Sequence, residues 1–196
     1  MELNSCLLIN EKLEFILTKG GKYKPRENAR RIWAFVLLLR NSGLRIGDAV
    51  TLERSRITGD KLFLYTAKTG TPVYVPLPAF VLTALEAVPK ISERHFFWSG
   101  ESKRDSATGD WQRALKGVFT EAKIPDGHAH RFRDTFAVGL LQAGVPMDRV
   151  SVLLGHSSIK VTEKHYSPWV RARQEQLEAD VRRTWDVKQP RASVVV

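Results

Sequence analysis

Four side chains in the C-terminal half of the sequence have the types and spacing needed to attack a phosphodiester. Tyr166 follows His156 by ten positions, and His130 and Arg133 lie upstream, three residues apart. A phenol can act as a nucleophile, a guanidinium can bind non-bridging phosphate oxygens, and imidazoles can hydrogen-bond or transfer protons. No other set of residues in this chain assembles a reaction so completely.

Each of these residues, taken alone, also has an ordinary explanation. His130 and Arg133 share a helix face and can reach one phosphate, but such a pair is usually an ordinary surface pair. His156 follows a glycine that ends a predicted helix, where a histidine often belongs to a loop. Tyr166 on a helix is usually a packed aromatic residue. The prediction therefore depends on several weak signals that converge.

Two further segments carry residues that suit the same chemistry. Arg45 follows a predicted helix end at Gly43, and Asp48, three positions later, can orient the Arg45 guanidinium toward a phosphate. Lys68 lies at the tip of a predicted hairpin, in the sequence Ala-Lys-Thr-Gly. A lysine on such a turn is commonly just solvated, but it can also donate a proton to a departing oxygen.

Helices and one β-hairpin must position these side chains. Pro25 suits the first turn of a helix that runs to about Asn41. Alternating apolar residues over 56–77 predict a hairpin with a third strand near 56–58. The other predicted helices are 44–52, 78–88, 111–122, 130–143 and 147–154, with a loose polar stretch at 99–109. The predicted fold class is α+β, mainly α-helical with one small three-stranded antiparallel sheet.

The last part of the chain is predicted as two helices. Ser157 or Ser158 can cap a helix that carries Tyr166. A second, highly charged helix over 170–185 has a narrow apolar stripe, made by Leu177, Val181 and Trp185.

Composition indicates a polyanionic partner. The 196 residues carry a formal net charge of +10 and an isoelectric point of about 9.9, which favours DNA or RNA over an anionic membrane surface. A merely basic soluble protein is the alternative that charge alone leaves open. A single cysteine and no visible signal peptide are natural in a reducing cytoplasm. The longest apolar run, 32–39, is too short to span a membrane and predicts a buried core helix.

Five motifs, in this order, resemble those of the catalytic domain of the tyrosine recombinase, or phage integrase, family. They are Gly-Leu-Arg-Ile-Gly-Asp at 43–48, Lys-Thr-Gly at 68–70, Val-Pro-Leu-Pro at 75–78, His-x-x-Arg-Asp-Thr-Phe-Ala at 130–137, and Leu-Gly-His-Ser-Ser-Ile at 154–159 before Tyr166. Each motif is weak by itself, but five in order with plausible gaps are a strong signal. The resemblance runs from about residue 25 to residue 170.

The resemblance implies a DNA strand transferase that needs neither metal nor nucleotide. Tyr166 would attack the phosphodiester, leaving a 3′-phosphotyrosyl link and a free 5′ hydroxyl. The other implied roles are phosphate clamping for Arg45 and Arg133, general acid toward the 5′ oxygen for Lys68, and phosphate hydrogen bonding with proton transfer for His130 and His156. The implied partner is double-stranded DNA, with four protomers assembled on it, although an isolated domain can be monomeric. The chain has no Gly-x-x-x-x-Gly-Lys-Ser/Thr loop and no His-Glu-x-x-His.

Two local departures from the family pattern bear on the site. The interval from His156 to Tyr166 is one residue longer than the familiar form, so a different helix register would turn His165 toward the phosphate instead. Asp134 stands where histidine is frequent, and we expect little consequence from it.

The resemblance also divides the chain into three parts. Residues 1–24 are a linker or remnant, 25–170 the catalytic domain, and 171–196 a C-terminal helix and tail, with 188–196 frayed. Family members usually carry a helical DNA-gripping domain ahead of the catalytic one, and 24 residues are too few for it, so we expect a piece of a longer protein rather than a naturally short one. The C-terminal helix packs either on its own domain or, as in the family, on a neighbouring protomer.

Two other functions compete with a site-specific recombinase. A type IB topoisomerase has a similar set of residues but reseals the same strand, and the Leu-Gly-His-Ser-Ser-Ile stretch favours the recombinase. The second is a DNA-binding module without catalysis, and the presence of all six candidate residues argues against it. The sequence does not specify the DNA target or the biological role.

Overall fold

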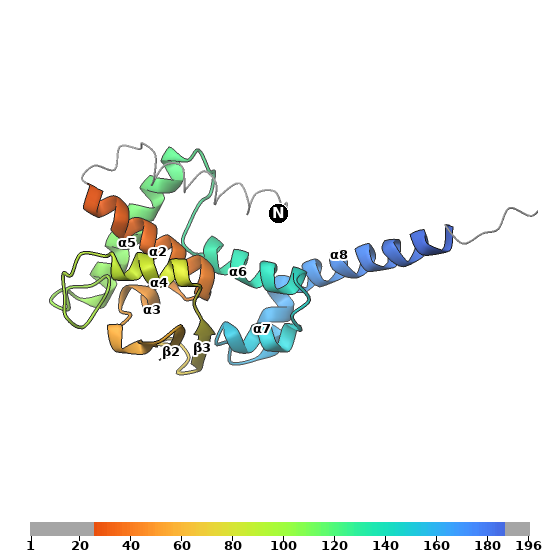
Figure 1. The fold of residues 1–196 in the computed structure, drawn as a ribbon, viewed down its shortest axis with the longest axis horizontal. Helices are drawn as coiled ribbons and strands as arrows, with labels where there is room; N and C mark the ends of the chain where they lie inside the picture. The colour runs from red at the N-terminus through yellow and green to blue at the C-terminus, as the bar shows by residue number, and fades with distance from the viewer. Residues whose placement is uncertain (1–25, 187–196) are drawn as a thin grey trace, which may run out of the picture.

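The computed structural model describes residues 26–186, so the predicted N-terminal segment 1–24 and the predicted tail 188–196 lie outside the described residues (Figure 1). The elements in chain order are α2 Arg26–Ser42, α3 Ile46–Val50, the 3-10 turn η2 Arg54–Arg56, β1 Ile57–Thr58, β2 Lys61–Tyr65, β3 Pro72–Pro76, α4 Ala79–Glu86, α5 Arg104–Glu121, α6 His130–Gln142, α7 Met147–Leu153 and α8 Ile159–Asp186. The predicted fold class is confirmed.

The apolar run 32–39 forms the middle of α2 and the centre of the main core, as predicted. All its residues except Trp33 are buried, and α2 packs against α4 and α6. The Phe35 ring stacks on Trp111 of α5 at a centroid distance of 4.1 Å and meets the edge of Phe97. Because α2 is held on several sides, its C-terminal end at Gly43 has a fixed position.

The sheet follows the predicted alternation of apolar residues. Its strand order is β1-β2-β3, with antiparallel pairing throughout, and Leu62 and Leu64 lie opposite Val75 and Val73. These four side chains are buried against the core, whereas the other face of β2 and β3 is exposed. The sheet therefore orients the β2–β3 turn, which carries Lys68, at its edge.

The helix α5 begins earlier than the sequence predicts. The stretch 99–109 was expected to be a loose polar segment, but α5 already begins at Arg104. Its first two turns are polar apart from Ala107, which is buried, so no apolar periodicity marks them. An acidic residue in the first turn, Asp105, favours a helix start there.

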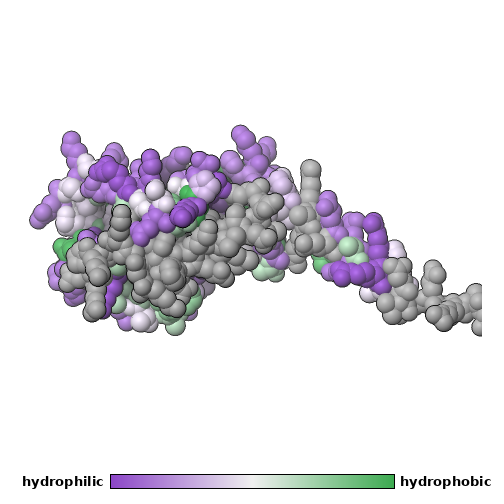
Figure 2. All heavy atoms as spheres, turned by 90° about the horizontal axis from the view of Figure 1, so that it is seen from above, coloured by the Kyte–Doolittle hydropathy of each residue, from purple (hydrophilic) through white to green (hydrophobic). Residues whose placement is uncertain are grey.

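The predicted pair of C-terminal helices is in fact one continuous helix, so that prediction was wrong. In α8, Ser158 accepts a hydrogen bond from the Lys160 amide at the start, and the helix continues through Pro168 to Asp186. The first part packs against α6 and α7. The second part projects from the body as an arm, on which Figure 2 shows both hydrophilic and apolar side chains (Figures 1 and 2). Its exposed apolar residues are Leu177, Val181 and Trp185.

Within residues 26–186, no helix has the length and apolar character needed to cross a membrane.

Candidate active site

Arg133 lies at the centre of the candidate site and joins two helix ends. Its side chain is buried on α6, where Nη1 donates to the Gly43 carbonyl and Nη2 to the Leu154 carbonyl, each at 2.6 Å. These carbonyls belong to the ends of α2 and α7, which carry Arg45 and His156 just beyond them. Burial, followed by the charge of Arg45, lowers the pKa of Arg133 to about 10, so the guanidinium stays charged at neutral pH. Three of its five N–H groups remain for an anion.

Arg45 is the second cation of the site, and it is held less firmly. It is the residue before α3, in an extended conformation with φ −69° and ψ 146°. Its Nη1 is buried without a hydrogen-bond partner among the described residues. Buried donors are nearly always paired, because an unpaired one loses its interaction with water. An unpaired guanidinium N–H beside a second guanidinium is a binding group for an anion.

Asp48 does not orient Arg45, contrary to the prediction. Its Oδ1 accepts from Arg104 Nη2 at 3.2 Å and from the Ala67 amide at 3.0 Å. Residues three apart share a face only within a helix, and Arg45 precedes α3 in an extended conformation. Asp48 instead holds the start of α5 and the β2–β3 turn beside the site.

Lys68 lies at an exposed turn whose flanks are attached to the site. The amide of Ala67 donates to Asp48, and Thr69 Oγ1 donates to the Gly155 carbonyl at 3.2 Å. The Lys68 side chain itself is exposed and makes no hydrogen bond or ion pair with the rest of the described chain. The structure therefore places its backbone next to the segment with His156 but leaves the amine free.

Both histidines are shifted toward the neutral form. His156 Nδ1 hydrogen-bonds Thr162 Oγ1 at 2.8 Å, which leaves Nε2 as the free nitrogen. Burial, then the charges of Arg133 and Arg45, lower the pKa of His156 to about 4. Burial also lowers the pKa of the more exposed His130, although the Asp134 charge opposes this shift. At neutral pH the two arginines thus supply most of the positive charge near these imidazoles.

Tyr166 lies in this cluster and is hydrogen-bonded to Asp134, from which the sequence led us to expect little consequence. It is 4% exposed, and its hydroxyl donates to Asp134 Oδ1 at 2.7 Å. Burial first, then this hydrogen bond, raise the pKa of the Tyr166 phenol. The neighbouring His165 is exposed, so the register that would have turned it inward is not the one adopted.

The structure thus brings together Arg45, Arg133, His130, His156 and Tyr166, with Lys68 close by along the backbone and Asp48 in a supporting position. Asp134, from which little consequence was expected, accepts the hydrogen bond of the Tyr166 hydroxyl. Its spacing of four residues from His130 places both on one helix face and was the available signal. Thr162 and Arg104 were also missed, because only folding brings them to His156 and Asp48.

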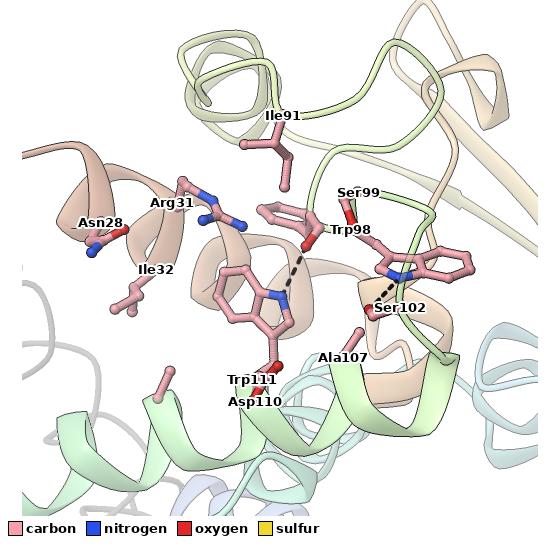
Figure 3. Close-up of a pocket in the computed structure, with 12 residues that line it drawn as sticks. Asn28, Arg31, Ile32, Ile91, Trp98, Ser99, Ser102, Ala107, Asp110 and Trp111 are labelled. Atoms are coloured by element: carbon pink, nitrogen blue, oxygen red, sulfur yellow. Dashed lines mark hydrogen bonds between the residues drawn. The ribbon is translucent and has the colours of Figure 1, made fainter.

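A separate cavity lies away from these residues. It has a volume of about 450 Å³ and lies between α2, α5 and the segment that contains Ile91 and Trp98 (Figure 3). Trp98 donates to Ser102 in its wall, and Arg31 lies over the Trp111 ring. None of the candidate residues lines it. Among the described residues, no three His, Cys, Asp or Glu side chains are grouped so that they could hold a metal ion.

Comparisons with known proteins find relatives over most of the chain. The phage integrase family model matches residues 14–169, a range that contains every candidate residue. The chain is 30% identical over 204 residues to tyrosine recombinase XerD of Mycobacterium tuberculosis, covering 97% of this chain and 62% of that protein. It is 25% identical over 160 residues to a probable integrase/recombinase of Acholeplasma phage L2, covering 80% of this chain and 55% of that protein. The chain therefore spans little more than half the length of these relatives.

Solved structures show the same fold. XerA recombinase superimposes with a TM-score of 0.66 at 18% identity, covering 90% of this chain and 64% of that one. The catalytic domain of bacteriophage HP1 integrase superimposes with a TM-score of 0.60 at 18% identity, covering 100% of this chain and 98% of that domain. The fold is that of tyrosine recombinase catalytic domains. With its motifs in order and the family model matching most of its length, the chain belongs to the phage integrase family.

Proposed function

We propose that this protein cleaves and rejoins double-stranded DNA at specific sites through a covalent 3′-phosphotyrosyl intermediate on Tyr166, without a metal ion. The observation that carries the proposal is the phenol of Tyr166 beside the Arg133 guanidinium, which is itself next to Arg45 from a distant part of the chain. Arg45 has an unpaired N–H, and Arg133 has N–H groups left after its two main-chain bonds. Together they bind the scissile phosphate and stabilise the negative charge that increases during attack.

The chemical step uses the remaining candidates in sequence. The Tyr166 oxygen bonds to phosphorus, the bond from phosphorus to the 5′ oxygen breaks, and Lys68 donates a proton to that oxygen. His156, neutral and fixed by Thr162, donates or accepts a hydrogen bond at the phosphate through Nε2. The phenolic proton of Tyr166 leaves as the new bond forms, and His130 assists its transfer away from the site. A 5′ hydroxyl from a second strand reverses the step and joins the strands. Asp48 supports the site by holding the turn that presents Lys68.

Double-stranded DNA as the partner is supported by charge and by the structural neighbours. The net charge of +10 favours binding to phosphates, and such binding weakens steeply with salt. XerH recombinase was solved on its palindromic difH substrate, and lambda integrase was solved as a tetramer on a Holliday junction. We therefore propose that this chain also assembles on DNA, through the exposed end of α8. Because its relatives are bacterial and phage proteins, we place its action in the cytoplasm, at the nucleoid.

The first prediction is that the protein forms a covalent adduct with DNA through Tyr166. Since the DNA target is unknown, the assay uses a pool of nicked duplexes with randomised sequence. Cleavage near the nick frees a short fragment that diffuses away, so the step cannot be reversed and the adduct accumulates. A denaturing gel should show adduct for the wild type with chelator present, and none for Tyr166→Phe. Tyr74→Phe is the matched control, because Tyr74 is exposed on the sheet and its loss should leave adduct formation unchanged.

Other outcomes would point to the two competing functions. Salt-sensitive DNA binding without adduct on any duplex would support a non-catalytic binding module. Relaxation of supercoiled plasmid without a preferred site would support a type IB topoisomerase. An adduct that persists in Tyr166→Phe would remove Tyr166 as the nucleophile.

A further inference from the structure

The proton of the Tyr166 hydroxyl already points toward a carboxylate. The hydroxyl donates to Asp134 Oδ1 at 2.7 Å, within the normal range for an O–H to oxygen hydrogen bond. An ionised carboxylate can only accept hydrogen bonds, so the hydroxyl proton lies between the phenolic oxygen and Asp134 on α6. The lone pairs of the phenolic oxygen therefore point in other directions. A nucleophile needs this orientation, because the lone pair must face phosphorus while the proton leaves on another side.

Asp134 is the nearest group that can take this proton. His156 has one ring nitrogen engaged by Thr162 and makes no hydrogen bond to the phenol within the described part of the chain. His130 contacts Asp134 Oδ1 through Nε2 at 3.7 Å rather than the phenol. The charged or titratable groups next to the Tyr166–Asp134 pair are Arg133 and His130 on α6. Arg133, His130 or His156 interact in turn with His128 before α6, with Arg45 and Asp48 at α3, and with His165 on α8.

We propose that Asp134 is a catalytic residue that accepts the phenolic proton of Tyr166 as the phosphotyrosyl bond forms. This inference rests on the proposed function. The O–H bond of Tyr166 breaks and its proton moves to Asp134 Oδ1, while the Tyr166 oxygen bonds to phosphorus. The 5′ oxygen leaves with the electron pair of its bond and takes a proton from Lys68. In the reverse step, protonated Asp134 returns its proton to the departing phenolate.

The distance, the charge change and the position of His130 favour this assignment. Geometry comes first for a general base, and Asp134 meets the distance requirement before any DNA is bound. The protonation also removes a negative charge from the neighbourhood of the phosphate while charge increases on the phosphate oxygens. His130, 3.7 Å from the same Oδ1, gives the proton a route onward from Asp134.

The test compares Asp134→Asn with the wild type in the nicked-duplex assay. Asparagine keeps the shape and a hydrogen-bond acceptor but is not a useful base, so adduct formation at pH 7 should be about 10²- to 10⁴-fold slower. The pH profile separates a base from a residue that only positions the phenol. Between pH 6.5 and 9 the wild-type rate should be nearly flat, whereas the Asn rate should rise about tenfold per pH unit, because hydroxide must then remove the phenolic proton.

Two further variants control for the loss of the carboxylate and for the change in net charge. Asp134→Glu keeps a carboxylate one methylene away and should retain the flat profile with an intermediate rate. Asp148→Asn makes the same charge change at an exposed position in the first turn of α7 and should leave rate and profile unchanged. Thermal melting, with circular dichroism as the readout, checks that each variant is folded. If the Asn variant does not fold, the profile of the Glu variant decides the question, and a tenfold rise per pH unit there would overturn the proposal.

The outcomes separate this inference from the proposed function. Wild-type adduct that depends on Tyr166, together with an Asn variant as fast as wild type, would overturn the role of Asp134 alone. An Asn variant faster than wild type would also overturn it, because the carboxylate would then restrain the phenol. No adduct from the wild type would contradict the proposed function and this inference together.

Discussion

Arg45 and Arg133 have the same charge but are held in opposite ways. Arg133 is buried, and its two main-chain hydrogen bonds join the ends of α2 and α7. Arg45 has a buried N–H without a partner among the described residues. The first guanidinium is therefore a structural tie between two helix ends, whereas the second makes no such tie through its Nη1.

This difference predicts distinct effects for two alanine substitutions. Arg133→Ala leaves two buried carbonyls unpaired, so the free energy of unfolding should fall by about 3 kcal/mol or more, since each unpaired group costs about 1–3 kcal/mol. Arg45→Ala should change it by less than about 1 kcal/mol, because no hydrogen bond is lost from Nη1. Both should slow adduct formation by about 10²- to 10³-fold, by analogy with loss of an oxyanion donor. Urea denaturation and adduct kinetics measure the two effects.

A stable Arg133→Ala protein would show that the tie is dispensable. Normal cleavage by either variant would remove that arginine from the site.

At the scale of elements, Gly155 forms the corner between α7 and the segment with His156. Its φ of +62° is in the left-handed region, and a Cβ there would lie 2.6 Å from Val73 Cγ2 on β3. Its carbonyl also accepts the hydrogen bond of Thr69 from the β2–β3 turn. This corner therefore fixes α7, the sheet and His156 relative to one another.

We predict that Gly155→Ala destabilises the fold more than the matched change Gly70→Ala. Gly70 has nearly the same φ, +64°, but a Cβ there would meet nothing within 4 Å. Gly70→Ala should thus report the backbone penalty alone, about 1 kcal/mol, whereas Gly155→Ala adds overpacking against Val73 for a total of about 2–4 kcal/mol. Urea denaturation of both variants checks the order. Equal losses would mean that the corner relaxes freely.

The elements that could be predicted from sequence are those with a strong local signal. The apolar run of α2, the alternation in β2 and β3, and the glycine stops at Gly43 and Gly144 each depend on neighbouring residues. The polar start of α5 has no such periodicity, and the continuity of α8 through Pro168 depends on packing against α6 and α7. Within the site, the types and order of the residues indicated which side chains come together, but the sequence did not reveal their hydrogen-bond partners. Asp48 binds residues 19 and 56 positions away, and Asp134 binds one 32 positions away.

At the scale of the whole molecule, the arm formed by the second part of α8 exposes an apolar stripe on a strongly basic protein. We predict that replacing Leu177, Val181 and Trp185 with Gln leaves the melting temperature nearly unchanged, because these side chains are exposed. DNA-dependent assembly should be lost, because the substitutions remove the apolar surface that a neighbouring protomer would bury. Sedimentation with and without duplex DNA measures both states.

Ala179→Gln, on the opposite face of the same helix, is the control and should assemble normally. Assembly that survives the triple substitution, or deletion of 171–196, would show that the protomers meet elsewhere.

The continuity of α8 has a mechanical consequence. Tyr166 and Trp185 are on the same helix, and at 1.5 Å per residue their Cα atoms are about 28 Å apart along its axis. A displacement of the outer end is therefore transmitted along one helix toward Tyr166. Pro168 cannot donate the usual main-chain hydrogen bond to the carbonyl of residue 164, so it weakens the turn 164–168, which contains Tyr166. Bending in this turn would tilt the outer end of α8 relative to the part that packs against α6 and α7, so the stiffness of one helical turn sets how much of that movement reaches Tyr166.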